Sequence, residues 1–131
     1  MKRAGFMTLG MLMGCATTTD TLGPLADAGS VERGRALFAT RDVARCSLCH
    51  EAPGIDAHGD VGPSLSGVGA RLSAAQLRLR IADITRVYPE SVMPTFHRTE
   101  GMTRVAPQYA GKPVLDAQQV EDLVAWLETL R

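Results

Sequence analysis

Apolar residues recur with a helical period in three segments of the chain, and no segment of useful length alternates between apolar and polar positions. The first segment carries Val31, Leu37 and Phe38, and the second carries Leu77, Ile81 and Ile84. The third stripe consists of Val120, Leu123, Val124, Leu127 and Leu130. Spacings of three and four residues place each set on one face of a helix, so the pattern predicts three amphipathic helices.

Polar residues that suit a helix N-terminus precede each stripe. Ser30 can cap the first helix, which we expect to end near Thr40. Ser73 with Gln76 has the spacing of a capping box, and we expect that helix to continue through Ile84. The same spacing recurs in Asp116 and Gln119, ahead of the last stripe. These signals fix where the three helices begin.

Two further expectations concern how these helices pack. Gly34 and Phe38 in the first helix, with Trp126 in the last, predict a crossing at which the glycine allows close contact. Arg78 and Arg80 are expected on the solvent-exposed face of the second helix. Between the helices lie glycine- and proline-rich loops at 53–69 and 88–113. The sequence therefore predicts an all-α fold with long loops, and long loops in a small domain usually carry function.

The first residues are expected to lie outside the folded domain. Lys2 and Arg3 precede ten residues without a charge, which is too short for a membrane span but typical of a signal peptide. The run ends in Leu-Met-Gly-Cys, which resembles the lipobox of bacterial lipoproteins, although Met13 is unusual in that pattern. We expect 1–14 to be a lipoprotein-type signal peptide and Cys15 to be lipidated. Ordinary cleavage after Ala16 is the alternative.

Both alternatives predict a periplasmic protein, anchored by lipid in the first case. Residues 15–29 lack an apolar period and are expected to form a flexible tether. The domain itself is then expected to span residues 30–131.

Composition removes one class of function. The 131 residues include 14 Lys and Arg and 14 Asp and Glu, without a basic cluster after Arg3, so the charge pattern that nucleic-acid binding needs is missing. Aromatic residues make up only 5% of the chain. That is few for a domain of about a hundred residues, which suggests that something besides side chains helps to fill the core.

A C-x-x-C-H sequence at residues 46–50 indicates what that filler is. Cys46 and Cys49 are spaced so that both thiols can form thioethers with the two vinyl groups of one haem, and His50 then lies under the iron. A thioredoxin-like redox pair would need a βαβ setting, and a zinc site would need more Cys or paired His. Neither is present in the sequence. We therefore predict one covalent haem c, with His50 as an iron ligand.

The second axial ligand has several candidates, namely Met93, Met102, His58 and His97. Met93 is favoured because it directly precedes Pro94 in a loop with proline on both sides, which can hold a thioether rigidly. Met and His together raise the reduction potential of a haem and suit electron transfer. An open distal face would instead suit ligand binding or peroxide chemistry.

Residues around these ligands are expected to support the haem. The carbonyl of Pro63 is predicted to accept a hydrogen bond from the ring of His50 and so to orient it. Arg71 is the first candidate to pair with a haem propionate, with Arg98 and Arg104 as further candidates.

These motifs together resemble those of class I c-type cytochromes. The matching residues are Gly34 and Phe38, the C-x-x-C-H sequence, Gly62-Pro63-x-Leu65, Met93-Pro94 and the helix around Trp126. More narrowly, the runs at 62–72, 92–94 and 110–115 are similar to those of SoxX, the small monohaem subunit of the SoxAX cytochromes of thiosulfate oxidation. The similarity covers about residues 31–131, and a lipid anchor would depart from the usual soluble SoxX.

The resemblance implies a role as well as a fold. It implies a class I cytochrome c fold and a haem-bearing SoxA-like partner, which joins thiosulfate oxidatively to a cysteine of a SoxYZ-like carrier. The chain would accept the released electrons and pass them to a soluble cytochrome c, without catalysing the sulfur chemistry alone. We expect the SoxA contact around Leu48, Ala52 and Pro94. The alternatives are a free-standing electron carrier and a haem sensor or peroxidase with an open distal site.

Overall fold

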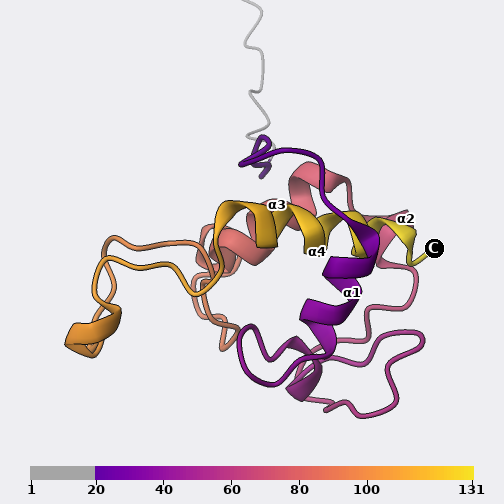
Figure 1. The fold of residues 1–131 in the computed structure, drawn as a ribbon, viewed down its shortest axis with the longest axis horizontal. Coiled ribbons are helices and arrows are strands. Elements are labelled where there is room, and N and C mark those ends of the chain that lie inside the picture. Colours follow the sequence, from indigo (N-terminus) through magenta and orange to yellow (C-terminus); the bar gives the residue numbers. More distant parts are fainter. Residues whose placement is uncertain (1–19) are drawn as a thin grey trace, which may run out of the picture.

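Every regular element within residues 20–131, the part of the chain described by this computed structural model, is helical (Figure 1). The expected all-α class is therefore confirmed. The α-helices are α1 (Val31–Ala39), α2 (Val68–Arg71), α3 (Ala74–Asp83) and α4 (Ala117–Thr129). Single 3₁₀ turns occur at η1 (Cys46–Leu48), η2 (Ile84–Arg86) and η3 (Pro107–Tyr109). The expected signal peptide and Cys15 lie outside the described residues.

The three long helices begin where their polar caps predict. The Ser30 hydroxyl accepts a hydrogen bond from the Arg33 amide at the start of α1. Complete capping boxes open α3 and α4, with Ser73 paired to Gln76 and Asp116 paired to Gln119. Each box satisfies amides that the first helical turn would leave without partners.

Helix α1 crosses α4 at the glycine expected from the sequence (Figure 1). A Cβ at Gly34 would collide with the Asp122 carbonyl and would lie 2.9 Å from Cβ of Trp126. One turn further on, the rings of Phe38 and Trp126 meet with their centroids 4.8 Å apart. The predicted close crossing is thus confirmed, and it brings the first and last helices into direct contact.

Helix α4 also packs against α2 and α3. The amide of Gly69 in α2 donates to the Leu130 carbonyl at the end of α4, at 2.9 Å. On its inner face α4 contributes five buried apolar side chains to the core: Val120, Leu123, Val124, Trp126 and Leu127. Helix α4 is therefore the element against which the other helices are assembled.

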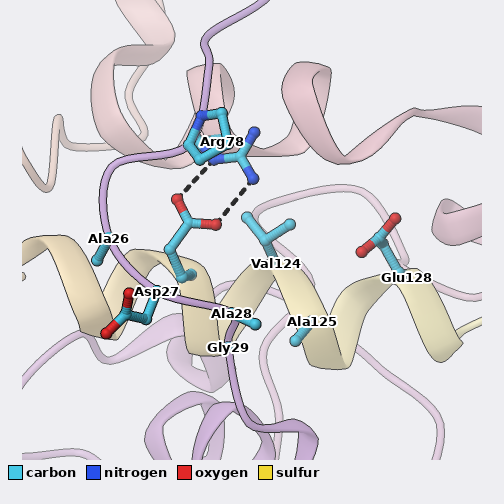
Figure 2. A pocket seen from close by; sticks show the side chains of 10 residues that line it. Ala26, Asp27, Ala28, Gly29, Arg78, Val124, Ala125 and Glu128 are labelled. Atoms are coloured by element: carbon cyan, nitrogen blue, oxygen red, sulfur yellow. Dashed lines mark hydrogen bonds and ion pairs between the residues drawn. The ribbon is translucent and has the colours of Figure 1, made fainter.

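Arg78 is buried, so the prediction that it lies on the solvent-exposed face of α3 is wrong. Its side chain is 7% exposed and that of Glu121 is 6% exposed. The guanidinium donates from Nε and Nη2 to the two carboxylate oxygens of Glu121, at 2.7 and 2.8 Å (Figure 2). Paired in this geometry, both charges can be buried, which neither could be alone.

Residues 20–29, part of the expected tether, lie against α3 and α4. Arg78 donates a further hydrogen bond to the Leu22 carbonyl, at 2.9 Å. The Leu25 amide donates to Glu121 Oε1, also at 2.9 Å, and a Cβ at Gly29 would collide with the Glu121 carbonyl. The neighbouring carboxylate of Asp122 accepts from the Ser30 amide and from Arg33. Glu121 thus holds this segment in place, and Asp122 holds the start of α1 that follows it.

Residues 100–114, which we call the arm, extend away from the helices (Figure 1). Its base is closed by two hydrogen bonds: the Leu115 amide donates to the Phe96 carbonyl, and His97 Nδ1 donates to the Leu115 carbonyl, both at 2.8 Å. The tip is formed by η3, and every residue of the arm is exposed.

Within residues 20–131, no helix is long and apolar enough to cross a membrane.

Candidate haem site

Cys46, Cys49 and His50 lie on one tight turn that begins in η1. The amides of Cys49 and His50 both donate to the Cys46 carbonyl, at 3.1 and 3.0 Å. Arg45, just before the turn, has φ of 55°, a left-handed conformation, at the start of η1. This local geometry keeps the two cysteines and the histidine within a single turn, as attachment to one haem requires.

Both thiols of this turn are free and half-buried. Burial raises the pKa of Cys46 to about 12, and the nearby Cys49 adds to the increase. The Cys46 thiol therefore stays neutral at physiological pH in the folded chain.

The ring of His50 is oriented by the next loop of the chain. Its Nδ1 lies 2.8 Å from the Pro63 carbonyl, the hydrogen bond expected from the sequence. A carbonyl can only accept, so the proton is on Nδ1 and Nε2 is left with its lone pair on the opposite side of the ring. The loop is fixed in turn by the Gly62 amide, which donates to the Cys49 carbonyl at 2.8 Å.

Gly62 lies directly against the His50 ring. A Cβ at Gly62 would lie 2.6 Å from Nδ1 and 2.8 Å from Nε2, too close for any side chain. The close approach that this glycine allows is therefore to the imidazole.

Gly59 is a supporting residue that sequence reasoning missed. Its amide donates to the Ser47 carbonyl at 2.9 Å, and a Cβ there would collide with the Leu48 carbonyl. Its only signal in the sequence was a glycine nine residues after the histidine.

The two methionine candidates differ in their surroundings. Met93 is half-buried and packs against the core, and its amide donates to the Ser91 hydroxyl at 3.1 Å. Met102 lies in the arm, 41% exposed, and its Sδ accepts a hydrogen bond from Thr95 at 3.5 Å. The Met93 thioether is thus held beside the core, whereas the Met102 sulfur has a polar partner of its own.

The two histidine candidates occupy different settings. His97 is half-buried and is tied by Nδ1 to the Leu115 carbonyl at the base of the arm. His58 is exposed on the loop that follows the cysteine turn.

The three arginine candidates are also separated. Arg71 is exposed and donates from Nη1 to the Ser66 carbonyl at 2.6 Å, which leaves other N–H donors for a carboxylate. Arg98 instead pairs with Thr85 and Asp83, at 2.9 and 3.4 Å. Arg104 lies in the exposed arm with φ of 56°.

Of the three residues expected around the partner contact, Ala52 does not fit. Ala52 is 3% exposed and belongs to the core, so it cannot contact another protein. Leu48 and Pro94 are exposed, and Leu48 is a large apolar side chain of the cysteine turn itself.

The donor set fits a haem c. Two free thiols share one turn with an imidazole whose Nε2 is available for iron, and a thioether is held beside the core. These are the groups that attach a haem covalently and ligate its iron on both faces.

Comparison with known proteins agrees with this chemistry. The family model for cytochrome c matches residues 31–131. A cytochrome c-553-like protein of Synechocystis sp. is 33% identical over 106 residues, which cover 81% of this chain and 74% of that protein. The chain therefore belongs to the cytochrome c family, and its cofactor is a covalently bound haem c, for which Cys46 and Cys49 provide the C-x-x-C-H motif.

Solved structures refine the class. A chain from the crystal structure of SoxXA from P. pantotrophus matches with a TM-score of 0.76 and 31% identity, covering 85% of this chain and 90% of that chain. The cytochrome SorU from Sinorhizobium meliloti matches with a TM-score of 0.51 and 20% identity, covering 76% of this chain and 88% of that one. The second match concerns the fold alone. The first supports a SoxX-like monohaem cytochrome, as the sequence runs suggested.

Proposed function

We propose that this protein is the electron-accepting monohaem subunit of a SoxAX-type complex. The match to a chain of SoxXA at 31% identity and a TM-score of 0.76, over 90% of that chain, carries the proposal. The runs at 62–72, 92–94 and 110–115, which resemble SoxX, support it from the sequence. In this role the chain accepts electrons released when a SoxA-like subunit joins thiosulfate to a SoxYZ-like carrier, and a soluble cytochrome c takes them onward.

The side chains of the candidate site suit this role. A haem c supplies reversible one-electron chemistry. His50 would hold the haem iron through Nε2, and the Pro63 carbonyl, which orients the ring, would make Nε2 more basic. Met93 is assigned as the other ligand because its thioether is held beside the core. Arg71 is assigned to a propionate, with its remaining N–H donors.

The identity of the distal ligand has a direct spectroscopic test. The Met93→Ala variant should lose the Met–iron charge-transfer band of the ferric protein, whereas the matched Met102→Ala variant should keep it. Loss of the band only in Met102→Ala would assign the distal ligand to Met102, in the arm. If the wild-type protein lacked the band altogether, the open-site function, a sensor or peroxidase, would replace electron transfer.

Export to the periplasm belongs to the same proposal. We assign 1–14 as a lipoprotein-type signal peptide and Cys15 as the lipidated residue. Intact mass of the mature, haem-loaded protein checks both assignments. A mass that begins at Cys15 and includes acyl chains supports them, whereas one that begins at Thr17 replaces lipidation with ordinary cleavage after Ala16.

The partner is tested by binding. Wild-type haem-loaded protein should form a stable one-to-one complex with a purified SoxA-like haem subunit from the same organism. Because Leu48 and Pro94 are exposed beside the haem-binding segments, Leu48→Asp or Pro94→Asp should weaken the complex. Val43→Asp, on a comparably exposed valine outside the cysteine turn, serves as the control.

A free-standing electron carrier is the second candidate function, favoured by the similarity to a cytochrome c-553-like protein. Failure of the wild-type protein to bind the SoxA-like subunit, together with rapid electron exchange with a soluble oxidase or dehydrogenase, would select this alternative.

A further inference from the structure

The arm contains several large apolar side chains that the protein's own core does not cover. Tyr109 is 63% exposed and Val114 is 51% exposed, and Val105 and Met102 are also among the exposed large apolar residues. Four such residues occur within fifteen residues of chain that project from the fold, and large apolar side chains left exposed in this way can serve protein association. The core lies elsewhere, among the helices.

The arm is nevertheless built to hold one shape. Its base is closed by the hydrogen bonds of Leu115 and His97, and its tip is tightened by η3, where the Tyr109 amide donates to the Ala106 carbonyl at 2.9 Å. Gly101 and Gly111 take left-handed φ values of 66° and 70°, although a Cβ at either would meet nothing within 4 Å. Conformation alone therefore calls for glycine there. A preformed projection loses less entropy on binding than a mobile loop does.

Two features of the arm indicate what kind of surface it contacts. Arg104 and Lys112 carry positive charge and Glu100 carries the only negative charge of residues 100–114, so the arm is net positive. Arg104 has φ of 56°, a conformation that is unfavourable for an arginine and that turns the chain within the arm. An acidic surface with an apolar centre would complement this combination of aromatic, aliphatic and cationic side chains.

The arm also begins close to the candidate electron-transfer site. It begins seven residues after Met93, and Val92, next to that methionine in the sequence, is 87% exposed. A partner held by the arm would therefore contact a segment joined directly to the one that carries Met93, the assigned iron ligand.

We propose that the arm is a preformed docking element for the electron-donating haem subunit, with Tyr109 and Val105 as its apolar anchors and Arg104 and Lys112 at its charged rim. The proposal rests on the proposed function for the identity of the partner. It adds a second contact, separate from the one around Leu48 and Pro94, and it predicts an acidic receptor surface on that subunit.

The binding experiment uses haem-loaded protein and the purified SoxA-like subunit from the same organism. Tyr109→Asp should raise the dissociation constant at least tenfold, and Val105→Asp should raise it by a smaller factor. Tyr109→Phe should stay within about twofold of wild type because it keeps the apolar ring. Val31→Asp, on a 44% exposed valine of α1, is the matched control and should also stay within about twofold.

Hydrogen exchange provides a readout that does not depend on substitutions. Amides of residues 100–114 should become protected when the SoxA-like subunit binds, whereas those of α1 should not change. Arg104→Gln and Lys112→Gln should slow association and reduce its dependence on salt. Unchanged haem content and unfolding midpoints in all variants would show that the fold is kept, as expected for exposed positions.

The possible results separate the two proposals. If wild type binds while Tyr109→Asp binds equally well and the arm stays unprotected, the arm proposal is overturned and the proposed function stands. If wild type does not bind at all, the proposed function fails and the arm proposal fails with it. If the isolated protein sediments as a dimer that Tyr109→Asp dissociates, the arm contacts a second copy of this chain, which also overturns the proposal.

Discussion

Replacing Gly62 with alanine should displace the imidazole of His50 from its hydrogen bond. The added Cβ would lie 2.6 Å from Nδ1 and 2.8 Å from Nε2, whereas ordinary contacts between such atoms are about 3.5 Å. The ring must therefore move by roughly 1 Å. Because Nδ1 is now 2.8 Å from the Pro63 carbonyl, such a movement would take the pair beyond hydrogen-bonding distance.

The energetic cost of Gly62→Ala has two parts. Loss of the hydrogen bond to Pro63 removes about 1 kcal/mol. Forcing a methyl group into a filled space costs about 1–3 kcal/mol more. The free energy of unfolding of the haem-loaded protein should therefore fall by roughly 2–4 kcal/mol. The midpoint potential should rise, because an imidazole that no longer donates to a carbonyl is less basic and stabilises ferric iron less.

Denaturant unfolding followed by haem absorbance and by Trp126 fluorescence gives the stability change, and a redox titration gives the potential. Gly23→Ala is the matched control because a Cβ at Gly23 would meet nothing within 4 Å. A Gly62→Ala protein with the stability and potential of wild type would refute the reasoning, since it would mean that the His50 ring does not lie against Gly62 in the haem-loaded protein.

Two further predictions concern the contacts of α4. Gly34→Ala should lower the free energy of unfolding by about 2–4 kcal/mol because its Cβ collides with the Asp122 carbonyl, and a denaturation midpoint equal to that of wild type would contradict this. Glu121→Gln should cost about 3–5 kcal/mol at pH 7 by leaving the Arg78 charge buried without its partner, as measured by chemical denaturation. Burial works to raise the pKa of Glu121, but the hydrogen bonds from Arg78 and the Leu25 amide outweigh it, so the pKa is lowered. The stability that this lowered pKa provides is present above the pKa of the unfolded chain, near pH 4, and is lost as the pH falls through the pKa of the folded protein. Glu121→Gln should therefore weaken the loss of stability on the acid side of the pH–stability curve. An unchanged acid side would rule out this contribution.

The sequence predicted features that depend on neighbouring residues. The starts of α1, α3 and α4 follow from caps within three residues of one another, and the C-x-x-C-H turn is likewise local. The crossing of α1 and α4 was predictable because Gly34, which has no side chain, lies one helical turn before Phe38 on the same face of α1. The caps and the turn are each contained in a short stretch of chain, whereas the crossing also needs Trp126 of α4.

The features that the sequence did not predict depend on distant residues. Arg78 looked like a solvated side chain because its partner, Glu121, is 43 residues away. The same pair accounts for the packing of residues 20–29, whose composition alone suggests a tether. Ala52 looked exposed because it follows the cysteine turn, yet it faces the core. Propensity and pattern carry no information about such pairings, which are set by the tertiary fold.

The dependence of the fold on α4 has a consequence for the order of events during maturation. Because α1, α2 and α3 all pack against α4, the core cannot close until the last residues of the chain have been synthesised. Cys46 and Cys49 emerge some seventy residues before α4 begins, in a polypeptide that still lacks the helix it must pack against. The order of segments along the gene thus leaves an interval in which both sulfurs are accessible to the machinery that attaches the porphyrin.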